Sequence, residues 1–256
     1  MTKRPLKMTI SLNALEHLGI NLYSNVPAVL SEIVANAWDA DAHTVMVTID
    51  KNAETITIQD DGHGMDRDGV IDRFLTVGFK RRDELGPTTP EGRSPMGRKG
   101  IGKLSIFSQV AKVYTLANGE RTAFQMDREV IKKSIAGKSE GAYEPDELTD
   151  WPADLVSGTR IVLGGLSKSL SALTVEGLKR RVARRFSIIG PKFKFSVTVN
   201  GDAIGPEDRG YHNVLEYLWT FGDTADFAKS CKHLKRPAQD RTSAVAAALK
   251  AHNLKL

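Results

Sequence analysis

The chain has 256 residues, of which 41% are hydrophobic and 26% charged, with 36 Lys and Arg against 31 Asp and Glu and a formal net charge of +5. This composition excludes a disordered or fibrous chain and predicts one large domain or a domain with an extension. The single cysteine, Cys231, excludes an intramolecular disulfide, and no apolar run approaches the roughly 18 residues of a membrane span. We therefore expect a cytoplasmic protein without a membrane partner.

The positive charge is unevenly distributed along the chain. Residues 167–256 hold 16 basic and 8 acidic side chains, whereas residues 1–166 hold 20 basic and 23 acidic ones. The last third therefore carries the surplus of positive charge, which indicates a second anionic partner besides any ligand of the first two thirds.

Hydrophobic periodicity and turn residues predict a mixture of helices and strands. In the first half we expect helices at 11–18 and 27–40, a hairpin of strands at 44–49 and 55–58, and a short helix that Asp66 caps and that ends near Val77. A long loop at 78–102 leads into a helix through Phe107. The later elements are strands at 111–117, 120–126, 158–163 and 193–199, a polar loop at 136–157, and helices at 175–186, 211–221 and 241–251.

Three polar residues share one face of the helix predicted at 27–40. Glu32, Asn36 and Asp39 stand at positions i, i+4 and i+7, which places them beside the apolar stripe. An ordinary solvated face would explain the two acids. It explains less well an asparagine among small residues, because asparagine is a poor helix former.

Two glycine-containing segments follow. Asp60-Asp61-Gly62-His63-Gly64-Met65 comes directly after a strand, where it is either a tight turn or a site at which backbone and carboxylate approach a ligand. The run from Gly97 to Lys103 opens a helix, and its amides can bind phosphate. Its spacing also fits a P-loop, but Leu104 stands where Ser or Thr would hold magnesium.

Together with Gly158-Thr159 at a strand start, these boxes resemble, in order and spacing, those of the GHKL ATPases. That family includes gyrase B, the ninety-kilodalton heat-shock chaperones, histidine kinases, MutL and the MORC proteins. The similarity covers roughly residues 10–200. Its pattern is nearest to the chaperone and MORC branch of the family, and it indicates a bacterial-type relative. The histidine-kinase branch is disfavoured, since the chain offers no dimerisation helix with a phospho-accepting histidine.

The resemblance implies a Bergerat fold, an α/β two-layer sandwich whose mixed, mostly antiparallel sheet is covered by helices on one face. It implies an ATP-binding domain at 1–205, an ATP lid at 78–99, and a basic, mainly helical extension at 206–256 that could begin a further domain. ATP and Mg²⁺ are the implied cofactors, and ATP-dependent homodimerisation is the implied output.

The family's roles carry over onto matching positions. Asp60 would accept from the adenine amino group with Thr159 beside it, Asn36 would ligate Mg²⁺, and Glu32 would deprotonate the attacking water. Asp39 has either a structural role or a role at the nucleotide edge. The implied nucleotide-binding residues are Asn36, Asp39, Asp60, Gly62, Gly64, Met65, Lys80, Gly97, Lys99, Gly100, Ile101, Gly102, Lys103 and Thr159.

Two functions remain open at this point. The first is slow, Mg²⁺-dependent ATP hydrolysis coupled to lid closure, with an output on an effector or on nucleic acid. The second is a nucleotide-gated binding module that does not hydrolyse ATP and acts through its basic last third. The basic helix, with five cations between Lys179 and Arg185, is either a solvated face or, with the residues up to Lys194, a nucleic-acid contact.

Overall fold

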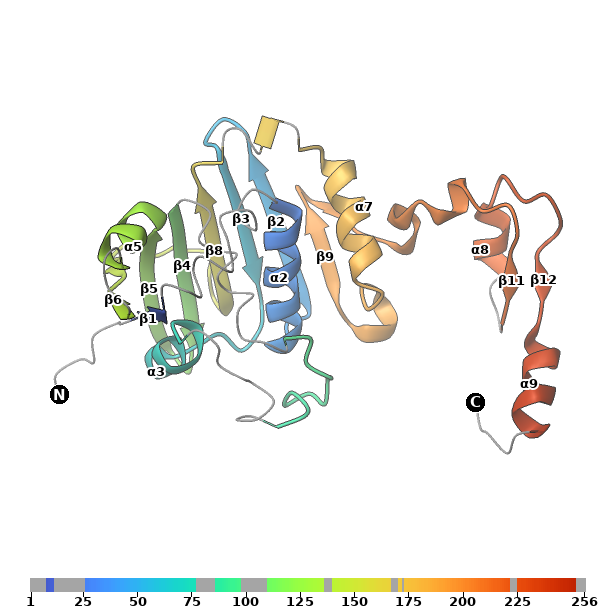
Figure 1. Ribbon diagram of the computed structural model, residues 1–256, viewed down its shortest axis with the longest axis horizontal. Helices are drawn as coiled ribbons and strands as arrows, with labels where there is room; N and C mark the ends of the chain where they lie inside the picture. The colour runs from blue at the N-terminus through green and yellow to red at the C-terminus, as the bar shows by residue number, and fades with distance from the viewer. Residues whose placement is uncertain are drawn as a thin grey trace. The chain divides into compact units, whose positions relative to one another are not determined.

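The computed structural model describes residues 8–11, 26–76, 86–97, 110–135, 140–166, 170–171, 173–221 and 225–251. The chain divides into two compact units, residues 1–204 and residues 205–256 (Figure 1). This boundary lies within a residue or two of the one expected from the sequence. The functions assigned to the two parts stay predictions.

An eight-stranded sheet forms the centre of the first unit. Its spatial order is β10 (Asp202–Ala203), β9 (Ser196–Val199), β2 (Thr44–Asp50), β3 (Thr55–Asp60), β8 (Gly158–Gly164), β4 (Val110–Ala117), β5 (Glu120–Asp127) and β7 (Asp146–Glu147). The pair β2 and β9 is parallel, and every other neighbouring pair is antiparallel. The prediction of a mixed, mostly antiparallel sheet is therefore confirmed.

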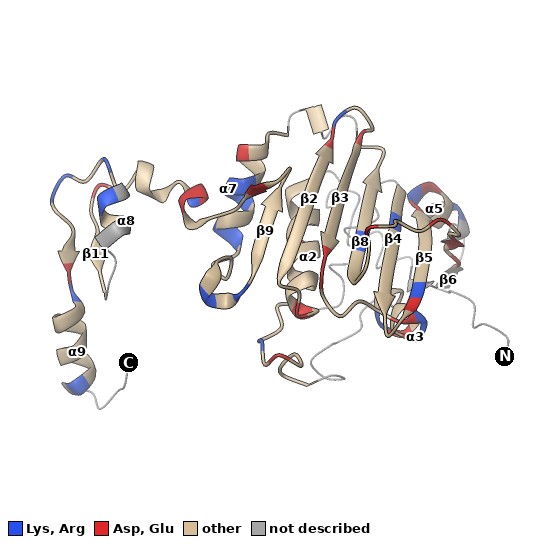
Figure 2. Cartoon of the chain, turned by 180° about the vertical axis from the view of Figure 1, so that it is seen from behind, with Lys and Arg blue, Asp and Glu red and all other residues tan. Residues whose placement is uncertain are grey.

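Helices cover one face of this sheet. Figure 1 shows α2 (Val26–Asp39) and α7 (Val175–Arg185) in front of the strands, and the view from behind in Figure 2 shows the strands in front of the helices. The apolar stripe of α2 is buried, with Leu30 and Val34 at 0% exposure. The core lies between this helical layer and the sheet, as the two-layer α/β sandwich requires.

Local sequence signals account for several boundaries. Asp66 caps α3 (Arg67–Gly69) by accepting from the Gly69 amide at 2.7 Å, and a single π-helical turn, η1 (Val70–Phe74), continues it. The turn between β4 and β5 has positive φ at Asn118 and Gly119, as a two-residue hairpin needs. These predictions are confirmed.

Other expectations are wrong. The loop expected at 136–157 contains the short strands β6 (Glu140–Tyr143) and β7, and β6 pairs with β1 (Met8–Ser11). The helix α5 (Arg128–Ile135) was not predicted. The strand expected from residue 193 begins at Ser196, because residues 191–193 form a 3₁₀ turn, η3. In the helix expected at 11–18, Ser11 belongs to β1, and the remaining residues lie outside the described part.

The second unit is small and weakly buried. It contains the 3₁₀ turns η4 (Pro206–Arg209) and η5 (Tyr211–Asn213), the parallel strands β11 (Trp219–Thr220) and β12 (Gln239–Asp240), and the helices α8 (Ala225–Ser230) and α9 (Thr242–Ala251). The helix expected at 241–251 is confirmed as α9, whereas the helix expected at 211–221 is wrong. Among its described residues, Trp219 and Val214 are 64% and 69% exposed.

A helix that crosses a bilayer must be both long and apolar. Within the described ranges, none of the helices combines the length and the apolar character that crossing a bilayer requires.

Candidate functional site

The three polar residues of α2 occupy different environments. Asn36 is exposed, the Glu32 side chain is 33% exposed, and Asp39 is buried with 7% exposure. Solvent exposure along this face of α2 is therefore highest at Asn36 and lowest at Asp39. An exposed amide oxygen is a suitable ligand for a hard cation such as Mg²⁺.

Asp39 connects α2 to the start of the glycine-rich segment. One carboxylate oxygen accepts from the Met96 amide at 2.6 Å and the other accepts from the Gly97 amide at 2.9 Å. Because both oxygens of the Asp39 carboxylate bind backbone amides, these contacts favour the structural role over the role at the nucleotide edge. Gly97 is thereby fixed beside the helix that carries Asn36.

Asp60 ends β3 as a buried carboxylate. Its Oδ1 atom accepts from the Gly62 amide at 2.9 Å and from the Thr159 amide at 3.3 Å. No described residue bonds to its Oδ2 atom. Burial raises the pKa of Asp60 to about 7, because desolvation penalises the charged form more than the two amide bonds favour it.

Two glycines allow the backbone to close around Asp60. A Cβ atom at Gly158, where φ is +78°, would lie 2.1 Å from the Asp60 carbonyl oxygen. A Cβ atom at Gly64, where φ is +63°, would lie 2.1 Å from the Leu116 carbonyl oxygen. Side chains at these positions would force the strands apart, which explains the glycines of both boxes.

The hydroxyl of Thr115 joins two of the predicted residues and was missed in the sequence. Its Oγ1 atom accepts from the Met65 amide at 2.8 Å and lies 3.1 Å from Thr159 Oγ1. Thr115 is fully buried on β4, directly opposite Thr159 of β8. Thr115 thus joins Met65 to Thr159, whose amide contacts Asp60, although a threonine in a strand gave no signal in the sequence.

We expect Thr115→Val to lower the free energy of unfolding by about 1 to 3 kcal/mol, because the Met65 amide loses its acceptor in a buried place. The measurement is denaturant unfolding of both proteins. Thr48→Val on the exposed side of β2 is the matched control and should change stability by less than about 0.5 kcal/mol. Equal effects of the two substitutions would contradict the role assigned to the hydroxyl.

Glu32 makes an ion pair that the sequence did not indicate. Its Oε1 atom lies 3.3 Å from a guanidinium nitrogen of Arg185, at the last residue of α7, and the Arg185 side chain is 58% exposed. The candidate base is therefore paired with a cation of the basic helix. An exposed pair of this kind is weak and easily broken.

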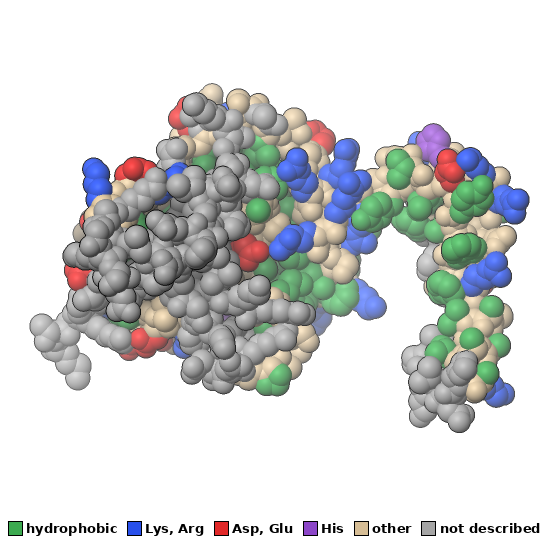
Figure 3. All heavy atoms as spheres, in the orientation of Figure 1, with side chains coloured by type: hydrophobic (Ala, Val, Ile, Leu, Met, Phe, Trp, Pro, Cys, Tyr) green, Lys and Arg blue, Asp and Glu red, His purple; other side chains and the backbone are tan. Residues whose placement is uncertain are grey.

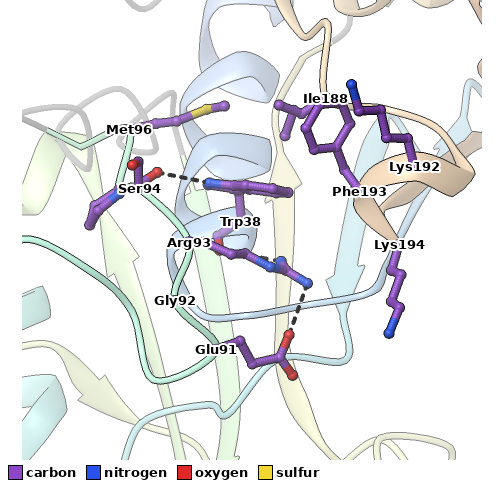
Figure 4. A pocket seen from close by; sticks show the side chains of 11 residues that line it. Trp38, Glu91, Gly92, Arg93, Ser94, Met96, Ile188, Lys192, Phe193 and Lys194 are labelled. Carbon is purple, nitrogen blue, oxygen red and sulfur yellow. Dashed lines mark hydrogen bonds and ion pairs between the residues drawn. The ribbon is translucent and has the colours of Figure 1, made fainter. Parts of the chain in front are cut away.

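Trp38, on the same helix, lies in a separate groove of about 800 Å³, shown in Figure 4. Its indole nitrogen donates to the Ser94 carbonyl at 3.0 Å, and the Arg93 guanidinium lies 4.4 Å from the ring centre. The ring also packs edge-on against Phe195. Trp38 therefore lies against the segment that carries Arg93 and Ser94.

Part of the predicted site cannot be placed. Lys80, Lys99, Gly100, Ile101, Gly102 and Lys103 lie outside the described residues. The described part contains no group of three His, Cys, Asp or Glu side chains that could hold a metal.

Comparison with known proteins gives one family match and several relatives. The family described as "Histidine kinase-, DNA gyrase B-, and HSP90-like ATPase" matches residues 23–154, just over half of the chain. That range contains Glu32, Asn36, Asp60 and Gly97. It ends before Thr159, which the fold places beside Asp60.

Two relatives have very different names. A "Putative type II restriction enzyme HgiDII" of Herpetosiphon aurantiacus is 35% identical over 233 residues, covering 90% of this chain and 37% of the relative. A "Chaperone protein HtpG" of Chromobacterium violaceum is 28% identical over 226 residues, covering 78% of this chain and 34% of the relative. The chain therefore spans about a third of the length of these relatives.

Proposed function

Because the chain belongs to the histidine kinase-, DNA gyrase B- and HSP90-like ATPases, we propose that it binds ATP with Mg²⁺ and hydrolyses it slowly. The observation that carries the proposal is the Oδ2 atom of Asp60, to which none of the described residues bonds. Its partner oxygen, Oδ1, is held by two amides, so Oδ2 has a fixed direction and can accept one hydrogen bond from an adenine amino group. Thr159, whose amide donates to Oδ1, is linked to Met65 by the hydroxyl of Thr115.

We propose that the phosphates lie along the face of α2 that carries Asn36. The Asp39 carboxylate fixes the backbone at Gly97 beside this face, which positions the start of the glycine-rich segment. We assign Mg²⁺ to the Asn36 amide oxygen; when bound, the ion neutralises phosphate charge. The remaining predicted phosphate contacts are Lys80, Lys99, Gly100, Ile101, Gly102 and Lys103.

Glu32 is the proposed general base of hydrolysis. It stands one helical turn before Asn36, so a water near the terminal phosphate would lie within reach of its carboxylate. The base takes the proton of that water as its oxygen attacks the terminal phosphorus, and the bond from that phosphorus to the bridging oxygen breaks, so that ADP leaves. The pair with Arg185 has to open or turn before Glu32 can do so.

The output of the ATP cycle is also a proposal. We propose that ATP orders the lid at 78–99 and promotes a homodimer, in which a second chain or a second domain supplies a cation to the terminal phosphate. One relative is named a chaperone and another a putative restriction enzyme, so the names do not give one common output. The cytoplasmic location stays a prediction from the single cysteine.

One observation favours the alternative of a binding module without hydrolysis. The base is engaged by Arg185, a residue of the basic last third through which that module would act. Both functions share the same adenine and magnesium contacts. Phosphate release distinguishes them, since nucleotide binding occurs in either case.

The assignment of Mg²⁺ to Asn36 is tested by Asn36→Ala. We expect the ATP affinity measured by calorimetry with Mg²⁺ to fall about tenfold, to the value of the wild type in EDTA, because the variant lacks the one protein ligand of the ion. In EDTA the two proteins should bind alike. Asn52→Ala in the exposed turn after β2 is the control and should bind as the wild type does. Equal Mg²⁺ dependence in wild type and Asn36→Ala would contradict the assignment.

A further inference from the structure

The helix α7 has one apolar side and one strongly cationic side. Leu178, Val182 and Ala183 are buried, which fixes the helix on the first unit. Figure 3 shows Lys and Arg side chains gathered on the surface where α7 lies, and Figure 2 shows the same charges from behind. We name this cationic side the α7 surface: Lys179, Arg180, Arg181, Arg184 and Arg185.

Helix stability does not explain this surface. Arg184 and Arg185 in the last turn interact favourably with the helix dipole. Arg180 and Arg181, however, face them at i, i+4, where like charges destabilise a helix. Glu176 is the one acid in the sequence from 175 to 199, and Lys192 and Lys194 follow as exposed cations. An arrangement that weakens its own helix points to an anionic partner.

The chemistry of the surface favours duplex DNA as this partner. A membrane surface would need a free apolar side next to the cations, and that side of α7 is buried in the core. A single strand would stack successive bases on aromatic rings. Phe186 at the end of α7 is buried, and Phe193, which is 39% exposed, packs edge-on against Trp38, so the described cations are not accompanied by a row of free rings. Duplex DNA presents about one phosphate charge per 1.7 Å, and the 11 residues of α7 extend over about 16 Å.

Arg185 belongs both to this surface and to the nucleotide site, because its guanidinium lies 3.3 Å from Glu32. We propose that duplex DNA binds the α7 surface and, by engaging Arg185, releases Glu32 to act on ATP. DNA binding and base release then share one cation, so they are coupled. This regulation rests on the proposed function, in which Glu32 is the general base.

The free energy of the Glu32–Arg185 ion pair sets the size of the expected effect on ATP turnover. An exposed ion pair contributes up to about 1 kcal/mol, which corresponds to a rate change of up to about fivefold. We therefore expect DNA to raise the turnover number for ATP two- to fivefold.

The test measures phosphate release and ATP binding with and without a mixed-sequence DNA duplex at low salt. In Arg185→Ala we expect the turnover without DNA to equal that of the DNA-stimulated wild type, with no further rise on adding DNA. Arg185→Lys should restore the response. Arg181→Ala should need more DNA for half-maximal stimulation, and its salt slope for DNA binding should be smaller by about 1. Lys51→Ala, in the turn after β2, is the control that leaves both responses unchanged.

Each contrary outcome overturns a different statement. If DNA and Arg185→Ala leave turnover unchanged while Glu32→Ala abolishes it, the coupling is wrong and the proposed function stands. If no sample releases phosphate although each binds ATP, hydrolysis and its regulation both fail. If polyglutamate stimulates as strongly as DNA at equal charge, the assignment of the surface to nucleic acid is wrong.

Discussion

Asp60→Asn is expected to weaken ATP binding by at least about 100-fold while leaving the fold intact. In the wild type, Oδ1 accepts from the Gly62 and Thr159 amides. An asparagine oxygen will keep these two bonds, so its NH₂ group takes the place of Oδ2. A donor then faces the adenine amino group, which is also a donor. The loss of a charge-assisted bond and this mismatch together correspond to about 3 kcal/mol.

Calorimetric titration with ATP and with GTP measures this effect. GTP has an oxygen in place of the amino group of ATP, so we expect the preference for ATP to decrease or reverse in Asp60→Asn. The matched control is Asp61→Asn. Asp61 Oδ1 also accepts two amides, those of His43 and Thr44, and an asparagine oxygen can keep both. Equal losses of ATP affinity in the two variants would refute the adenine contact.

The raised pKa of Asp60 adds a dependence on pH. With a pKa of about 7, the carboxylate is mostly ionised at pH 8 and mostly protonated at pH 6. The affinity for ATP should therefore fall up to about tenfold from pH 8 to pH 6. In Asp60→Asn this dependence should disappear, because no group titrates at that position.

The same pKa has the opposite consequence for stability. Because the pKa is higher in the folded than in the unfolded chain, the folded state binds the proton more tightly, and its contribution to stability is lost as the pH rises from about 4 to 7. Asp60→Asn removes this pH-dependent loss of stability, because asparagine carries no titratable group. We expect the variant to be more stable than the wild type at pH 8, by at most about 4 kcal/mol, and the difference to shrink at pH 4. Thermal unfolding at both pH values measures it.

The central part of the site could be predicted from the sequence because its residues lie in short, ordered boxes. Asp60 and Thr159 were predicted together, and in the structure the Thr159 amide donates a hydrogen bond to the Asp60 carboxylate, 99 residues away in the sequence. Thr115 could not be predicted, because its role comes from the register between β4 and β8, which no local pattern specifies. The Glu32 and Arg185 pair depends in the same way on how two distant helices pack.

The errors in secondary structure have different causes. The helix α5 was missed although Asp127 gave a readable signal, accepting from the Glu129 amide at 2.7 Å as an N-cap residue does. The helix expected at 211–221 does not form. Tyr217 and Trp219 of that segment are more than half exposed, so no core stabilises a helix there.

Glu32→Ala is expected to reduce ATP turnover by at least about 100-fold and to change ATP affinity less than about twofold. General bases contribute roughly 10²- to 10⁴-fold to such reactions. Glu32 is not among the groups assigned to adenine or Mg²⁺, so binding should persist. Phosphate release in single-turnover conditions and ATP titration, measured on the same samples, give the two quantities.

Glu32→Gln separates loss of the base from loss of the side chain. Glutamine keeps the length of the side chain and removes the negative charge that Arg185 contacts, so it tests proton transfer with little change in shape. Glu54→Gln, in the exposed turn before β3, is the control for loss of one carboxylate. Turnover above 10% of wild type in Glu32→Gln would exclude Glu32 as the base. If wild type and Glu32→Ala both bind ATP and neither releases phosphate, the chain is a nucleotide-gated binding module, and Arg185 holds a carboxylate that performs no hydrolysis.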